Sequence, residues 1–272
     1  MSLGKAIRLQ RIFGDPSGRL LSVAVDHFIG YPKTMTDGLH DLPKTLAQIA
    51  AAKPDAVTMM EGCATHCWSP YAGQMALIIQ IGCFTPDDRV AETIGSVQGV
   101  LRLGADAVAV SIGVRGSREG YYLRMLSEAV TEAERFGLPV IAHIYPRAYN
   151  DGAAAMVADP DNIAWAVRCG IECGADVIKV TYPGDPLAFR DIIACCPVPV
   201  IAAGGPRTDT FQQALLQAEA IMTSGASGLT VGRNVWAPDR NTIAAISAYK
   251  LVVHERLPVN EAIKVVDEAG LT

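Results

Sequence analysis

The composition of the chain narrows the classes of protein to which it can belong. It has 272 residues, half of them hydrophobic and 19% charged, with a net charge of −5. That is enough apolar material for one large folded domain, and the lack of a basic excess argues against nucleic acid as the main partner. No apolar run approaches the ~20 residues of a membrane span, and no signal-peptide pattern opens the sequence. Seven cysteines, an odd number, suit reduced thiols, so we expect a cytoplasmic protein with no membrane partner.

Short apolar runs alternate with helical patterns along the chain. Several predicted helices end in a glycine that leads into the next strand, as in Gly104-Ala105-Asp106 and Gly174-Ala175-Asp176, which is typical of helix C-caps. The predicted strands are Leu20–Val25, Ala56–Met60, Leu77–Ile81, Ala107–Ile112, Pro139–Ile144, Asp176–Thr181, Val198–Ala203 and Gly228–Val231. The predicted helices are Gly4–Ile12, Leu42–Ala52, Arg89–Leu103, Gly120–Phe136, Asp161–Cys173, Pro186–Cys195, Asp209–Thr223 and Asn241–Val253.

This alternation predicts an α/β fold with a parallel sheet. Strands that are apolar throughout are covered on both faces, and eight strand–helix units favour a closed (β/α)8 TIM barrel over an open doubly wound sheet. There is no linker or low-complexity segment, so we expect a single domain over residues 1–272. The amphipathic segment Gly4–Ile12 is expected to close the bottom of the barrel.

Lys179 is the most informative residue of the predicted barrel. It lies inside the apolar run VIKVT at 177–181, and burying an ammonium is costly unless it is paired or loses its proton. Desolvation can lower a lysine pKa from about 10.4 to roughly 7–8. The neutral amine can then form a Schiff base with a ketone or an aldehyde. The other interpretation is a strand-end lysine that reaches water or pairs with Asp176 or Asp185.

Other polar residues follow the predicted strands, where the reactive groups of such barrels lie. Asp26 follows the first strand, while His143 and Tyr145 share one face of the fifth at a spacing of about 6–7 Å. We expect carboxylate, phenol and amine to converge at the mouth, which is the set that Schiff-base aldol chemistry needs. Taken singly, Asp26 is equally compatible with a helix cap or an ion pair, and Tyr145 with strand-end packing. The same position in the barrel selects His27, Glu61, Ser111, Arg115, Arg147 and Tyr182.

A candidate phosphate site follows the last two strands. Gly204-Gly205 comes after the seventh strand and Gly232-Arg233 after the eighth. Glycines let backbone amides approach an anion closely, barrels of this kind often hold a phosphate at these loops, and Arg233 can make a bidentate contact. The alternative is that these glycines are only turn residues.

Metal chemistry has little support in the sequence. The five histidines show no HxH or HExxH spacing. The cluster Cys63, His66 and Cys67 offers three side chains that could bind zinc, whereas structural zinc sites usually have four ligands. We therefore expect no metal and no cofactor.

Five segments together resemble a known family. They occur in order and at compatible spacing, and they resemble the archaeal-type class I fructose-bisphosphate aldolases, a group within the DeoC/LacD family of (β/α)8 aldolases. The resemblance implies that Lys179 forms the Schiff base, that Tyr145 transfers protons and that Asp26 is its acid/base partner. It also implies phosphate binding by the backbone of Gly204, Gly205 and Gly232, with Arg233 beside it. The segments are VAVDHFIGYP (23–32), IYPRA (144–148), ADVIKVTYPGD (175–185), PVIAAGGP (199–206) and GASGLTVGRNVW (225–236).

Three positions depart from the family pattern. Phe28 and Ala148 stand where the family usually has glycine, and His143 stands where it often has an aromatic residue. The phenylalanine reshapes the pocket beside the acid, and His143 adds a second possible acid/base group. The family also contains aminoheptulosonate synthases, which carry out transaldol chemistry, and a thiolase that acts on a phosphorylated signal molecule.

Taken together, these features predict a lyase: a metal-independent class I aldolase that acts on a small phosphorylated keto compound. Catalysis is assigned to Lys179, Tyr145, Asp26 and His143, and the substrate-binding set includes His27 and Arg147 beside the phosphate loops. Two functions of other classes stay open, a non-catalytic phosphosugar-binding barrel and a phosphosugar isomerase or epimerase without a covalent lysine. Relatives of the fold commonly assemble into rings, so we also expect a homo-oligomer.

Overall fold

Eight parallel strands close into a barrel. The computed structural model describes residues 1–27, 38–150 and 153–268. The strands follow the order β6-β3-β2-β1-β11-β10-β9-β7, and pairing of β7 with β6 closes the ring. All eight predicted strands are therefore confirmed, as is the TIM barrel. Their bounds are β1 Leu20–Ala24, β2 Ala56–Met60, β3 Ala76–Gln80, β6 Ala107–Val114, β7 Val140–Asn150, β9 Val177–Thr181, β10 Val200–Ala203 and β11 Gly228–Val231.

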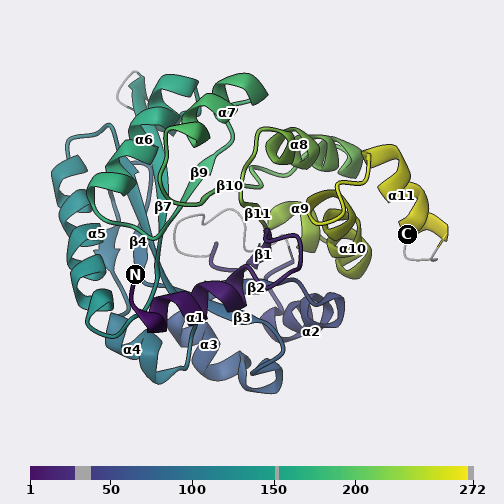
Figure 1. Ribbon diagram of the computed structural model, residues 1–272, viewed down its shortest axis with the longest axis horizontal. Coiled ribbons are helices and arrows are strands. Elements are labelled where there is room, and N and C mark those ends of the chain that lie inside the picture. Colours follow the sequence, from purple (N-terminus) through teal and green to yellow (C-terminus); the bar gives the residue numbers. More distant parts are fainter. Residues whose placement is uncertain (28–37, 151–152, 269–272) are drawn as a thin grey trace.

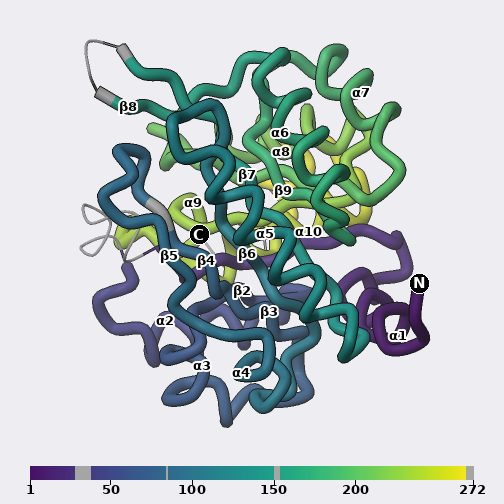
Figure 2. Tube along the Cα trace, turned by 90° about the vertical axis from the view of Figure 1, so that its left-hand side faces the viewer, coloured from purple at the N-terminus to yellow at the C-terminus, as the bar shows by residue number. Residues whose placement is uncertain are grey.

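Helices surround the barrel, and α1 lies across one end of it (Figure 1). Figure 2 shows α1 at one end of the molecule and the segments β4, β5 and β8 at the other. In the described residues, no helix is long and apolar enough to cross a membrane. The helices are α1 Leu3–Ile12, α2 Leu42–Ala52, α3 Glu61–Cys67, α4 Val97–Arg102, α5 Glu119–Glu134, α6 Pro160–Glu172, α7 Pro186–Ala194, α8 Phe211–Thr223, α9 Arg233–Trp236, α10 Thr242–Val253 and α11 Val259–Glu268.

The lower half of the barrel interior is filled with apolar side chains. Inward-facing residues such as Ile78, Ile141, Val177 and Ile201 form a buried cluster with Ile12 of α1. Outward-facing side chains of the same strands belong to a second core between the sheet and the helices. Helix α1 thus closes the bottom of the barrel, as predicted, and the closed floor leaves room for a site only at the opposite, carboxyl end of the strands.

The turns that lead into the strands repeat one arrangement at the closed end. Gly104 and Gly174 adopt the left-handed backbone expected of helix C-caps, with φ of 71° and 81°. Two residues later, Asp106 accepts a hydrogen bond from the backbone N–H of Leu77 at 3.1 Å. Asp176 accepts one from Val140 at 2.9 Å. These carboxylates tie each strand start to its neighbour in the sheet.

The predicted helix over Arg89–Leu103 is wrong in its first half. Residues there form β5 (Ala91–Thr93), which pairs antiparallel with β4 (Gly82–Phe84). The helix α4 begins only after Ser96, whose hydroxyl accepts from the N–H of Gly99 at 3.0 Å. A second antiparallel strand, β8 (Ala153–Met156), pairs with the end of β7. Both hairpins rise beside the open end of the barrel and extend the walls of the site.

Candidate active site

A cavity of about 340 Å³ lies at the carboxyl ends of the strands. Its floor contains Lys179, and side chains from β1, β3, β6, β7, β10 and β11 and from the loops after them complete its walls. Apolar side chains also line the cavity, among them Met60 of β2, Cys83 of β4 and Met156 of β8. The strand order therefore brings residues from both halves of the sequence to one site.

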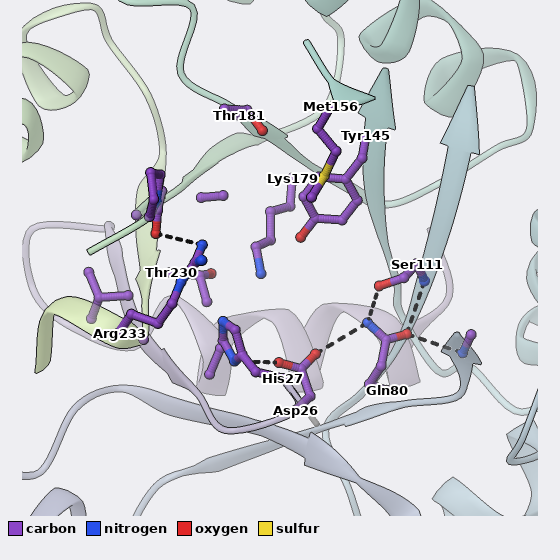
Figure 3. A pocket seen from close by; sticks show the side chains of 18 of the residues that line it. Asp26, His27, Gln80, Ser111, Tyr145, Met156, Lys179, Thr181, Thr230 and Arg233 are labelled. Atoms are coloured by element: carbon purple, nitrogen blue, oxygen red, sulfur yellow. Dashed lines mark hydrogen bonds and ion pairs between the residues drawn. The ribbon is translucent and has the colours of Figure 1, made fainter. Parts of the chain in front are cut away.

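Lys179 lies in the centre of this cavity on β9 (Figure 3). It is 4% exposed. Burial lowers its pKa below that of an ordinary lysine, and the nearby charge of Asp26 opposes this shift only in part. Two carboxylates that were alternative partners are engaged elsewhere, since Asp176 pairs with Lys5 at 3.0 Å and Asp185 caps α7. Side chains on β9 alternate between faces, because Val177 belongs to the cluster inside the barrel and Ile178 to the outer core.

Tyr145 and Asp26 extend toward Lys179 from opposite sides of the cavity (Figure 3). Tyr145 is half-buried on β7, two residues beyond His143. Asp26 follows β1, with a side chain 12% exposed. A carboxylate, a phenol and an amine therefore face one space large enough for a small ligand, as the positions of these residues in the sequence predict.

His143 lies beneath the cavity. It is 2% exposed, and the described residues that line the cavity do not include it. The pairing of β7 with β9 places it directly beside Lys179. Burial, together with the charges of Lys179 and His27, holds the pKa of His143 well below its usual range. At neutral pH it is therefore a neutral imidazole against the reactive amine.

Gln80 is a site residue that the sequence analysis missed. It is the last residue of β3 and 2% exposed. Its side chain contacts Ser111 and Asp26 (Figure 3). It also contacts His143, so that it joins residues on or after three other strands. Gln80 could have been found as a polar residue in an otherwise apolar strand, ALIIQ. The same feature identified Lys179 in VIKVT.

The loops after β10 and β11 form one connected structure. Arg233 Nη2 donates to the carbonyl of Gly205 at 3.1 Å. Asn234 donates to the carbonyls of Gly204 and Pro206 at 3.3 and 3.0 Å. Gly205 has a φ of 72°, in the left-handed region that favours glycine. These contacts hold Gly204, Gly205 and Arg233 along the wall of the cavity.

His27 packs against the same wall. Its ring lies edge-on to Trp236 at 5.4 Å between centroids, and its Nδ1 is 3.5 Å from Asp26 Oδ1. A Cβ on Gly232 would lie 2.8 Å from the His27 ring, so only glycine fits there. Burial lowers the pKa of His27 to about 4, with the charge of Asp26 opposing the shift. His27 therefore presents a neutral ring to the cavity at pH 7. Phe28, the departure from the family pattern next to it, lies outside the described residues.

The structure does not bring Arg147 to the cavity. Its side chain is fully buried and forms an ion pair with Asp88, in the turn between β4 and β5. The hydroxyls of Tyr122 and Tyr149 contact the same carboxylate at 2.8 and 3.3 Å. The physical reason is that β7 continues past the barrel rim into its hairpin with β8, so the alternation that places Tyr145 in the cavity does not hold for Arg147. This arginine fastens the β4–β5 hairpin instead of meeting a ligand. Of the other residues selected by position, Ser111 lines the cavity, whereas Glu61, Arg115 and Tyr182 do not.

Two groups contain residues of metal-ligating types. Cys63, His66 and Cys67 lie on α3 outside the cavity. In the described residues, the ligand atoms of this cluster do not come together as a metal site would require. Ligand atoms of Asp15, Asp55 and His254 do lie within 4.8 Å of one another. They belong to the closed end of the barrel, where His254 Nδ1 also contacts Ser17 Oγ at 3.1 Å.

Comparison with known proteins assigns the chain to a family. The family model of the DeoC/LacD family aldolases matches residues 20–238. The chain belongs to the DeoC/LacD family of aldolases. It is an enzyme, a lyase of the class I aldolase type, and the resemblance seen in its motifs is thereby confirmed.

Three relatives illustrate the range of this family. The chain is 35% identical over 258 residues to the 2-amino-3,7-dideoxy-D-threo-hept-6-ulosonate synthase of Halobacterium salinarum, covering 93% of this chain and 92% of that one. It is 30% identical over 248 residues to the 2-amino-4,5-dihydroxy-6-oxo-7-(phosphonooxy)heptanoate synthase of Streptomyces griseus, covering 88% and 87%. An archaeal fructose-1,6-bisphosphate aldolase, whose structure has its catalytic lysine covalently bound to the carbinolamine intermediate, superposes with a TM-score of 0.79 at 30% identity, covering 92% of this chain and 99% of that one.

Proposed function

We propose that this DeoC/LacD aldolase forms an iminium between Lys179 and a small phosphorylated keto sugar. The observation that carries the proposal is the state of Lys179: it is buried, its pKa is lowered, and it lies in a cavity that Tyr145 and Asp26 also line. A lowered pKa increases the fraction of neutral amine near pH 7, and the neutral amine is the form that attacks a carbonyl.

The proposed reaction uses only groups of this chain. In the cleavage direction, Lys179 Nζ attacks the carbonyl carbon and water leaves, which forms the iminium. Tyr145 or Asp26 removes the proton of the substrate hydroxyl two carbons away, the carbon–carbon bond breaks, and its electron pair enters the iminium to give an enamine. The aldehyde departs, a proton returns to the enamine carbon, and water hydrolyses the iminium to release the ketone. Neutral His143 is a poor candidate for the proton transfer, because it lies beneath the cavity wall.

We assign the phosphate of the ketone to the wall formed by Gly204, Gly205, Gly232 and Arg233. Arg233 supplies a positive charge at the cavity wall, and the glycines leave backbone close to the ligand space. Guanidinium groups suit phosphate because their donors match its oxygens. Met60, Met156 and Val157, which line the cavity from other segments, have apolar side chains that offer a phosphate no donor. A phosphorylated ketone would therefore bind with its phosphate toward β10 and β11.

Retro-aldol logic suggests which ketone to test. Cleavage of fructose 1,6-bisphosphate between its third and fourth carbons gives dihydroxyacetone phosphate. Cleavage of 2-amino-4,5-dihydroxy-6-oxo-7-(phosphonooxy)heptanoate, which names the product of the Streptomyces relative, between carbons four and five gives the same ketone. The aldehydes differ, one being a phosphate and the other an amino acid. We therefore propose dihydroxyacetone phosphate as the ketone half, while the aldehyde is to be found by a panel.

The test is borohydride trapping followed by intact mass and peptide mapping. Dihydroxyacetone phosphate is offered first, then fructose 1,6-bisphosphate and other phosphorylated ketoses. We expect a reduced adduct on the peptide that contains Lys179, and loss of that adduct in Lys179→Ala. Lys5 is an internal control, because it is equally buried but ion-paired, and it is expected to stay unmodified.

The other outcomes identify the alternative functions. Near wild-type turnover by Lys179→Ala would disprove the Schiff-base mechanism. Ligand binding without any adduct would indicate a phosphosugar-binding barrel, and proton exchange on a ketose without adduct would indicate an isomerase or epimerase. Adduct formation with release of an acyl thioester in the presence of coenzyme A would indicate the thiolase reaction.

A further inference from the structure

The amide of Gln80 has one possible orientation. Its Oε1 accepts hydrogen bonds from the backbone N–H of Gly82 at 3.1 Å and of Ser111 at 3.0 Å. Backbone N–H groups can only donate, so the atom that faces both of them must be the oxygen. The two backbone N–H groups therefore also fix the position of the amide nitrogen, and the protonation state of no side chain enters this assignment.

The nitrogen of Gln80 then faces three acceptors. Nε2 lies 2.7 Å from Ser111 Oγ, 2.9 Å from His143 Nδ1 and 3.4 Å from Asp26 Oδ2. An amide nitrogen has two hydrogens and accepts nothing, so the shorter pair of contacts is satisfied and the contact with Asp26 is the weakest. His143 Nδ1 must accept. A neutral imidazole that accepts at Nδ1 carries its proton on Nε2.

We propose that Gln80 is a positioning residue that fixes His143 as the neutral Nε2–H tautomer directly beside the reacting amine of Lys179. The assignment of a role in the reaction rests on the proposed Schiff-base function of Lys179, but the assignment of the tautomer does not. Neither residue needs to touch substrate for the arrangement to act.

The charges around His143 explain why its state matters. Lys179 faces it from β9 and His27 from the segment after β1. Gln80 of β3 and Ser111 of β6 contribute uncharged groups, and the carboxylate of Asp26 lies 3.4 Å from Gln80 Nε2. The iminium at Lys179 is a cation that must form in this buried space. An imidazolium on the neighbouring strand would oppose it, and a fixed neutral ring does not.

Gln80→Glu changes the charge of this arrangement with little change of shape. The carboxylate still accepts the two backbone N–H groups, but its second oxygen faces His143 Nδ1 as an acceptor. His143 would therefore bind a second proton. Its positive charge opposes the iminium more than the new carboxylate on β3 favours it, because β7 lies next to β9 and β3 does not. We expect nitrogen-15 spectra of the side chains to show His143 of the wild type as neutral Nε2–H throughout the neutral pH range, with its signal assigned by absence in His143→Gln. In Gln80→Glu the same signal should titrate near neutral pH, and adduct formation at pH 7 should slow about tenfold or more.

Gln80→Met is the matched control. It keeps a side chain of similar volume and removes both donors, so His143 loses its fixed tautomer without gaining a charge. We expect adduct formation to fall less than in Gln80→Glu, and to fall without the new titration. A merely structural role predicts the reverse order, because methionine disturbs the hydrogen bonds more than glutamate does.

Two results would overturn the proposal. One is a wild-type His143 that titrates with an ordinary pKa or carries its proton on Nδ1. The other is a protonated His143 in Gln80→Glu with an unchanged rate of adduct formation. Failure of the Schiff-base function is separately visible, because it removes the wild-type adduct and leaves the spectrum of His143 unchanged.

Discussion

The closed end and the open end of the barrel each contain a buried lysine. The pKa of the lysine at the closed end is raised, and that of the lysine at the open end is lowered. Lys5 and Lys179 are both 4% exposed. Burial alone would lower the pKa of Lys5, but its hydrogen bonds to Glu134 and Asp176 outweigh burial and raise the pKa. For Lys179 burial dominates, with only the charge of Asp26 to oppose it, and the pKa is lowered. Partners rather than depth decide whether a buried lysine is a structural cation or a candidate nucleophile.

Arg147 at the rim extends the comparison. Like Lys5 it is a buried cation with a carboxylate partner, and its partner Asp88 also contacts the hydroxyls of Tyr122 and Tyr149. The paired cations hold the ends of the barrel in place, while the amine in the middle faces the cavity. The variants below test this division, beginning with the largest expected loss of stability.

Asp88→Asn should lower the unfolding free energy more than any other variant considered. It leaves the guanidinium of Arg147 buried without a counter-charge, which costs about 3–5 kcal/mol in unfolding free energy. Urea unfolding measures it. The control is Asp191→Asn, whose partner Arg190 is exposed, and it should cost less than about 1 kcal/mol. Equal costs in the two variants would mean that the buried pair at the rim contributes no more than a surface pair.

Lys5→Met should cost less, about 1–3 kcal/mol, because Asp176 loses a partner but keeps the backbone N–H of Val140. The folded-state pKa of Lys5 lies above 10.5, so its contribution is complete below that pH and is lost as the pH rises through the folded-state value. The stability difference between wild type and Lys5→Met should therefore be constant near pH 7 and shrink above about pH 10.5. Lys44→Met, at an exposed position, serves as the control. A difference that grows with pH would contradict the raised pKa of Lys5.

The barrel itself was predictable because its signals are local. Near-continuous apolar strands and glycines at helix ends predicted all eight strands and the closure by α1. The segment Arg89–Leu103 failed because an antiparallel hairpin beside the barrel depends on a partner strand, Gly82–Phe84, which a single-segment pattern does not show. The extent of the domain over residues 1–272 stays a prediction.

The site was predictable only in part. Residues placed by strand alternation, such as Lys179 and Tyr145, do reach the cavity. Arg147 does not, because β7 leaves the barrel at Pro146. Gln80 was not predicted because it lies inside β3, whereas polar site residues were expected after each strand. The links among Gln80, His143 and Ser111 join three strands far apart in sequence. Such contacts depend on strand order, which the sequence patterns do not contain. The roles of these residues in the reaction stay predictions.

Lys179→Met should raise the unfolding free energy, whereas Lys5→Met lowers it. Of the variants considered, apart from the controls, it should change stability least. The folded-state pKa of Lys179 lies below 10.5, so the unfolded chain binds its proton more tightly and the folded state pays for burial at low pH. Replacing the amine with an apolar side chain of similar length should raise the unfolding free energy by about 1–2 kcal/mol near neutral pH. The gain should shrink as the pH rises from the folded-state pKa through about 10.5, because above that pH Lys179 is neutral in both states. Unfolding in urea across this pH range, together with loss of the trapped adduct, measures both consequences. If Lys179→Met were instead destabilised to the same extent as Lys5→Met, Lys179 would be a structural cation, and the proposed nucleophile would have to be abandoned.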